Sequence, residues 1–241
     1  MSFPKKGPSL ANFSLFGHNQ ATRIAEADSV AVIGLGRFGS ALALELMASG
    51  TEVLGIDGSE EIVQNHNGLL THVVRANSTK LDTLRELSVP EFDRVVVAIG
   101  SDIQASILTA SLLLKLKIPT IWAKAVNDAH GEILTQLGIH HVIYPEKQMG
   151  QRVAHLVRGS MQDYIKIEDN FALVKTTVPK SMLGVPLGQS QARTKHQITV
   201  TAFNRPGEGW TYTTLETVLQ PDDVILIAGT PDRVEAFSQL R

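Results

Sequence analysis

From Ser29 onward, hydrophobic and polar positions alternate in blocks of two kinds. Short, nearly continuous apolar runs are typical of parallel strands buried on both faces, and each is followed by a run with the periodicity of an amphipathic helix. The predicted strands cover 29–36, 51–57, 71–77, 93–100, 120–126 and 140–146. The predicted helices cover 38–50, 59–66, 78–88, 101–117 and 127–138. This alternation predicts an α/β fold, a Rossmann-like doubly wound parallel sheet.

Capping residues support these boundaries. Ser, Thr, Asp and Asn side chains accept hydrogen bonds from the first backbone N–H groups of a helix. Such residues stand where four of the helices should begin: Ser59, Ser78 or Thr79, Ser101 or Asp102, and Asn127 or Asp128.

The pattern changes after the sixth predicted strand. Apolar residues at helical spacing predict a connecting helix, and short β-branched strands with Pro, Gly and Asp turns then follow from Tyr164. We therefore expect a small, mostly antiparallel α+β domain at the C-terminus. The predicted organisation is a leader at 1–28, a nucleotide-binding domain at 29–148, a connecting helix at 149–162 and the second domain at 163–241.

Composition and charge exclude several classes of function. The chain has 241 residues, and 43% of them are hydrophobic. Its net charge is −2 and its pI is near 6.4, so it has no overall positive charge to attract nucleic acid. It has no cysteine, which excludes thiol chemistry and Cys-ligated zinc and fits a cytosolic location. No apolar run reaches the ~18 to 20 residues of a membrane span.

The leader contains two lysines but no signal-peptide core. It is predicted to be either a flexible solvated tail or a docking segment that carries Phe13, Leu15 and Phe16.

Three glycines after the first predicted strand carry the main chemical signal. Gly34, Gly36 and Gly39 form the G-x-G-x-x-G pattern between a strand and a helix, where it cradles a pyrophosphate. Asp57 ends the second strand, where a carboxylate can bind ribose hydroxyls and would repel a 2′-phosphate. A nucleotide site is therefore predicted, although the same glycines could serve only to pack the strand on the helix.

Further candidates lie in the loop and at the ends of other strands. Arg37, between the second and third glycines, could reach an additional phosphate or could be a solvated surface residue. The carboxyl ends of parallel strands converge on one edge of the sheet. The other candidates for nucleotide binding are Phe38, Asn77, Ile99, Gly100, Lys124 and Glu146. No catalytic constellation is recognisable, and the histidines lack metal-ligand spacing.

Several of these stretches together resemble a known family. The segments "AVIGLGRFG", "VVRAN", "VVVAIGSDIQASILT" and "LGIHHVIYPEKQMGQRVA", with the β-rich module after them, are similar to KtrA-like RCK (KTN) subunits of Ktr/Trk potassium uptake systems. The resemblance implies a non-enzymatic, cytoplasmic regulatory protein. Such subunits form an octameric ring of dimers on a KtrB/TrkH-type membrane subunit and change shape when ATP replaces ADP.

The resemblance also implies roles for particular residues. Arg37 would meet the terminal phosphate of ATP in a neighbouring subunit, and Asp57 would bind the ribose. Asn77 would lie near the adenine and Lys124 near the phosphates. Glu146 would lie near a divalent cation, Mg²⁺ or Ca²⁺, shared between subunits.

The C-terminal module resembles the RCK_C domain, which in several relatives binds cyclic di-AMP. Arg193 matches the family's ligand-binding arginine, but Thr199 stands where an asparagine is expected. Because threonine lacks the amide, this difference weakens the expectation of cyclic di-AMP binding.

The glycine fingerprint and Asp57 leave a second function open: an NAD(H)-binding oxidoreductase or redox sensor. The regulatory hypothesis predicts that ATP binds and that Arg37→Ala weakens its binding. The oxidoreductase hypothesis predicts that NADH binds more tightly than ATP and that Arg37→Ala leaves the affinity unchanged.

Overall fold

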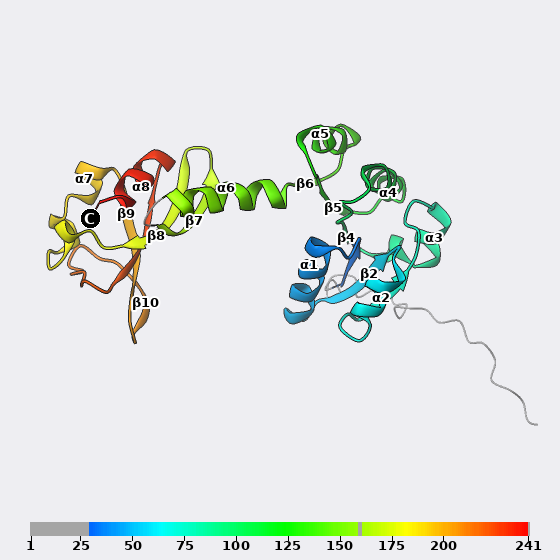
Figure 1. Cartoon of the computed structure of the whole chain (residues 1–241), viewed down its shortest axis with the longest axis horizontal. Helices are drawn as coiled ribbons and strands as arrows, with labels where there is room; N and C mark the ends of the chain where they lie inside the picture. Colours follow the sequence, from blue (N-terminus) through cyan, green and yellow to red (C-terminus); the bar gives the residue numbers. More distant parts are fainter. Residues whose placement is uncertain (1–28, 159–160, 241) are drawn as a thin grey trace, which may run out of the picture. The chain divides into compact units, whose positions relative to one another are not determined.

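The computed structural model describes residues 29–158 and 161–240, and the predicted leader lies outside them. The chain divides into two units, Met1–Pro145 and Glu146–Arg241 (Figure 1). In the described part of the chain, no helix is long and apolar enough to cross a membrane.

The first unit contains a parallel sheet with the strand order β3-β2-β1-β4-β5-β6. Its strands are β1 (Ser29–Ile33), β2 (Glu52–Asp57), β3 (His72–Arg75), β4 (Arg94–Val97), β5 (Thr120–Lys124) and β6 (His141–Ile143). Its helices are α1 (Arg37–Ala48), α2 (Glu60–His66), α3 (Leu81–Glu86), η1 (Val89–Glu91), α4 (Ile103–Lys115) and α5 (Asp128–Leu137). The predicted Rossmann-like architecture is confirmed.

Helices cover both faces of this sheet because alternate strand residues point to opposite sides. On β1, Val30 and Val32 pack with side chains of α1 and α2, whereas Ala31 and Ile33 pack with those of α3, α4 and α5. The strand order reverses between β1 and β4, and ligands of this fold bind at the carboxyl ends of the strands beside such a reversal.

The predicted caps are confirmed for three helices. Side chains of Ser59, Asp102 and Asn127 accept from the backbone N–H groups of Ile62, Ala105 and His130. Helix α3 differs: it begins after Lys80, which supplies no side-chain cap. Ser78 is buried and its hydroxyl bonds to that of Thr109 at 2.9 Å, so it is not available as a cap.

The second unit contains an antiparallel sheet with the order β10-β9-β11-β8-β7. Its strands are β7 (Met161–Glu168), β8 (Phe171–Thr177), β9 (Thr199–Arg205), β10 (Gly209–Tyr212) and β11 (Val224–Gly229). Its other elements are η2 (Lys180–Met182), η3 (Leu187–Gln189), α7 (Ala192–His196) and α8 (Pro231–Ser238). Helix α8, which the sequence pattern did not single out, buries Val234 and Phe237 in the core of this unit.

The connecting helix is α6 (Pro145–Arg158), which begins earlier than the predicted range of 149–162 because proline suits the first turn of a helix. It also ends earlier, since β7 already begins at Met161. From Glu146 onward this helix belongs to the second unit. Arg152 donates to both carboxylate oxygens of Asp163 at 2.9 and 2.7 Å, and the His155 ring stacks on that of Tyr164.

Candidate functional site

Only glycine fits at one position in the loop between β1 and α1, which we call the glycine loop, and at one position in the first turn of α1. Gly34 has a φ of +95°, and a Cβ there would lie 2.9 Å from the backbone nitrogen of Ile99. A Cβ on Gly39 would collide with the carbonyl oxygen of Gly34. These contacts fix the loop against the end of β4 and the first turn of α1. Gly36, by contrast, has open space where a Cβ would be.

The N-terminus of α1 is suited to an anion. Its first N–H groups have no helical acceptor, Gly36 supplies no capping side chain, and its first turn has no acidic residue. The N-termini of α2, α4 and α5 are instead capped by side chains. Since the positive end of the helix dipole adds to the donated hydrogen bonds, a phosphate can bind at this end of α1.

Asp57, at the end of β2, holds the glycine loop from the other side. Its carboxylate accepts from the Leu35 N–H at 2.7 Å and from the Ser59 N–H at 2.9 Å, one bond to each oxygen. A carboxylate has about four lone-pair sites, so two remain for ribose hydroxyls. Asp57 thus links the glycine loop to the start of α2.

Lys124 brings a cation to the same edge of the sheet. It is buried at the end of β5, with its Nζ atom 5.8 Å from the centre of the Phe38 ring. The same Nζ lies 3.1 Å from where a Cβ of Gly100 would be. The predicted residues Phe38, Ile99, Gly100 and Lys124 therefore lie around the glycine loop.

The remaining predicted residues are placed as follows. Arg37 is the first residue of α1 and is exposed. Asn77 is exposed after β3, and its Oδ1 atom accepts from the backbone N–H and the hydroxyl of Thr79. Glu146 is exposed in the first turn of α6 and belongs to the second unit, so its place beside the phosphates stays a prediction.

The two residues predicted for cyclic di-AMP lie in the second unit. Arg193 is exposed on α7, and Thr199 is the half-buried first residue of β9. As for metals, no three His, Cys, Asp or Glu side chains of residues 29–158 and 161–240 come together in a way that could hold an ion.

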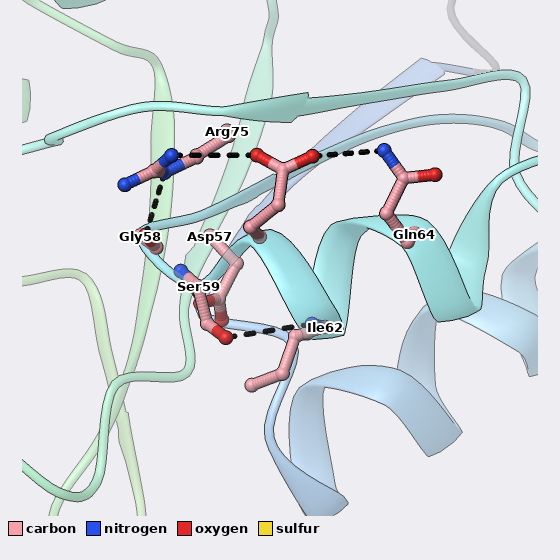
Figure 2. A network of polar contacts seen from close by, with 7 residues as sticks. Asp57, Gly58, Ser59, Ile62, Gln64 and Arg75 are labelled. Atoms are coloured by element: carbon pink, nitrogen blue, oxygen red, sulfur yellow. Dashed lines mark hydrogen bonds and ion pairs between the residues drawn. The ribbon is translucent and has the colours of Figure 1, made fainter.

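Two polar contacts near the loop escaped the sequence analysis. The Ser40 hydroxyl lies 2.6 Å from Nε2 of His66, whose Nδ1 lies 2.7 Å from the Ile62 carbonyl oxygen. Because a carbonyl only accepts, Nδ1 is assigned the hydrogen, and in the neutral imidazole Nε2 then accepts from the Ser40 hydroxyl. In the second contact, Arg75 reaches from β3 to the carbonyl of Gly58 (Figure 2). No local motif marks either pair, because the partners are far apart in sequence.

The loop glycines allow a paired prediction. Gly39→Ala should lower the free energy of unfolding by about 1 to 3 kcal/mol, because its Cβ meets backbone. Gly36→Ala should fold normally but bind nucleotides about tenfold more weakly, because a Cβ there stands where the pyrophosphate must approach. Urea titration and calorimetry measure the two effects. If both variants lost the same stability and the same affinity for nucleotides, the separate roles assigned to Gly36 and Gly39 would be contradicted.

The glycine loop, the open end of α1 and Asp57 define a Rossmann-like domain of the nucleotide-binding type, followed by a separate α+β domain. Family models agree: a TrkA-N domain matches residues 30–145 and a TrkA-C domain matches residues 171–240.

Individual relatives give the same result. The chain is 34% identical to the Ktr system potassium uptake protein C of Bacillus subtilis over 210 residues, 87% of this chain and 95% of that protein. It is 36% identical to protein A of the same system and organism over 208 residues, 86% and 94% of the two chains. The chain therefore belongs to the family of TrkA-type RCK (KTN) regulatory subunits of Ktr/Trk potassium uptake systems.

Solved structures support the fold. The GsuK RCK domain superposes with a TM-score of 0.61 at 18% identity, covering 88% of this chain and 47% of that one. A structure described as the GsuK channel bound to NAD gives a TM-score of 0.60 at 18% identity, with 85% and 38% covered. The present chain thus spans less than half of these solved chains.

Proposed function

We propose that this chain is the nucleotide-sensing subunit of a potassium uptake system. ATP and ADP compete for the glycine loop, and their exchange changes potassium flux through a membrane subunit of the KtrB/TrkH type. The observation that carries the proposal is the uncapped, acid-free N-terminus of α1 with Arg37 as its first residue. The Ktr relatives support the kind of partner. In this proposal the protein is not an enzyme, and it lies in the cytoplasm, peripheral on the inner face of the membrane.

Sensing requires different affinities for the two nucleotides in two conformations. A ligand shifts a conformational equilibrium only by its differential affinity for the two states. ATP and ADP share the ribose and base that Asp57 and Asn77 would contact, so the difference must arise at the terminal phosphate. The exposed guanidinium of Arg37 is suited to contact that phosphate, in its own subunit or in a neighbour.

Assembly into a homo-octameric ring of dimers is part of the proposal, and α6 supports it. None of the described side chains of this helix is buried, and Met149, Val153 and Val157 repeat at a spacing of four residues. Such a stripe favours packing against another apolar surface. In this arrangement the sheet of the first unit binds the nucleotide, α6 transmits the change, and the strands from β7 onward form the second domain.

The proposal includes two further ligands, a divalent cation and cyclic di-AMP. Glu146 supplies a single carboxylate, so Mg²⁺ or Ca²⁺ there would need phosphate oxygens and a neighbouring subunit to complete its coordination. Arg193 is exposed and could contact the phosphates of cyclic di-AMP, but Thr199 offers a hydroxyl where the family has an amide.

Arg37→Ala tests how ATP is distinguished from ADP. The variant should bind ATP about tenfold more weakly, because a charge-assisted contact to the terminal phosphate is lost, and should bind ADP as the wild type does. Calorimetry on the full chain measures both affinities. Arg85→Ala is the matched control, because Arg85 is another exposed arginine, paired with Asp82 on α3.

The same titrations decide between the two functions. Because a solved relative of the same fold is described as bound to NAD, NADH is included as a competitor. If NADH binds more tightly than ATP and Arg37→Ala changes neither affinity, the alternative of an NAD(H)-binding oxidoreductase or redox sensor replaces the present proposal.

A further inference from the structure

We infer that Arg75 is a positioning residue for ribose recognition. By holding the turn after β2, it aims the carboxylate of Asp57 at the ribose hydroxyls. The inference rests on the proposed nucleotide function and adds to it a residue on a different strand from the glycine loop and Asp57.

Asp57 depends on the turn that follows it. Its backbone is fixed to β3, because the Ala76 N–H donates to the Asp57 carbonyl at 2.9 Å. Its side chain, however, is oriented by two amides, and one of them is the Ser59 N–H at 2.9 Å. That N–H and the Gly58 carbonyl belong to the same planar peptide unit, so the orientation of this peptide sets the direction of both groups. A rotation of this turn would therefore turn the carboxylate away from the ribose.

Arg75 is placed to prevent that rotation. Asp57 and Arg75 are register partners in the parallel strands β2 and β3, so their side chains leave the sheet side by side. The Nε atom of Arg75 donates to the Gly58 carbonyl at 3.2 Å (Figure 2). Its Nη1 atom lies 3.4 Å from Oε2 of Glu60, whose Oε1 accepts from Gln64 at 2.8 Å. The guanidinium thus clamps the turn to the first turn of α2.

Ser59 is tied to α2, because its hydroxyl accepts from the Ile62 N–H and its carbonyl from the Val63 N–H. Gly58 itself has no side chain, and apart from its chain neighbours no atom lies within 4 Å of where a Cβ would be, so Arg75 is the side chain that holds its carbonyl. The side chains of Arg75 and Glu60 are 61% and 56% exposed, and ion pairs this exposed contribute little to folding stability. Loss of Arg75 should consequently appear in ligand recognition and not in the stability of the unit.

The test compares ATP with 2′-deoxyATP, because Asp57 is the group expected to bind the 2′-hydroxyl. Calorimetry on the full chain should show that the wild type prefers ATP by about tenfold or more. Arg75→Ala should weaken ATP binding about 3- to 10-fold, leave 2′-deoxyATP nearly unchanged and so shrink the preference. Its ratio of ATP to ADP affinity should not change. Arg85→Ala, which removes an exposed arginine from α3, should keep the wild-type preference.

An Arg75→Ala variant that keeps the wild-type preference for ATP over 2′-deoxyATP would overturn the inference. Equal weakening of both nucleotides would do the same, since it would indicate a general effect on the site. A wild type that does not distinguish the two also overturns it, without affecting the proposed sensing of ATP and ADP. If the wild type binds no adenine nucleotide, the proposed function fails first and the inference with it.

Discussion

Replacing Asp57 by alanine is expected to weaken the binding of ATP and of ADP by the same large factor, about 100-fold. Two effects add in this variant. The nucleotide loses a charged acceptor for its ribose, and the Leu35 and Ser59 amides lose the carboxylate that orients them. Because neither effect involves the terminal phosphate, the ratio of the two affinities should stay at its wild-type value. Isothermal titration with each nucleotide measures both numbers.

Asp82→Ala is the matched control for this experiment. Asp82 is an exposed carboxylate on α3 whose contact with Arg85 spans 3.6 Å, and its removal should leave both affinities unchanged. A loss confined to ATP, or a loss of less than about threefold for both nucleotides, would contradict the assigned role of Asp57.

The second large effect concerns the stability of the C-terminal unit. Asp223 is buried before β11, and Arg205 of β9 donates to both of its carboxylate oxygens at 2.9 Å. The Gln220 N–H donates to the same group at 2.8 Å. Asp223→Ala leaves these donors without their acceptor. The free energy of unfolding should fall by about 3 kcal/mol, the lower end of the range for buried pairs, because the Arg205 guanidinium can reach water. Urea titration measures the loss.

The same pair should make this unit sensitive to acid. The hydrogen bonds from Arg205 hold the pKa of Asp223 below its usual value. A carboxylate with a lowered pKa stabilises the folded state fully above its unfolded pKa of about 3.9, and this contribution is lost as the pH falls through the folded pKa. The wild type should therefore lose more stability below about pH 4 than Asp223→Ala does. Asp169→Ala, which breaks an exposed pair with Lys166, is the control and should behave like the wild type. Identical urea midpoints for the variants at positions 223 and 169 would refute the assigned role.

Features with a local signature could be predicted from the sequence. Continuous apolar runs and helical periodicity predicted the sheet, and the spacing of Gly34, Gly36 and Gly39 predicted the loop, which the structure places beside the reversal of strand order. Asp57 was expected because it ends the second strand. These features depend on neighbours along the chain, which a sequence shows directly.

What could not be predicted depends on partners that only the fold brings together. Ser78 looked like a helix cap, but its hydroxyl is buried against Thr109 and α3 begins later. The contact of Arg75 with Gly58 likewise joins residues 17 positions apart. The sequence pattern also gave no sign that Asp57 would orient the loop amides, because its expected role concerned the ligand and not the protein.

The most direct test of the central claim is potassium flux measured with ATP and with ADP. The full chain would be added to vesicles that contain the membrane subunit of the same uptake system, with Arg37→Ala as the matched variant. The account predicts that flux differs between saturating ATP and saturating ADP, and that Arg37→Ala removes most of this difference. Equal flux with the two nucleotides, in vesicles where both are shown to bind, would contradict it.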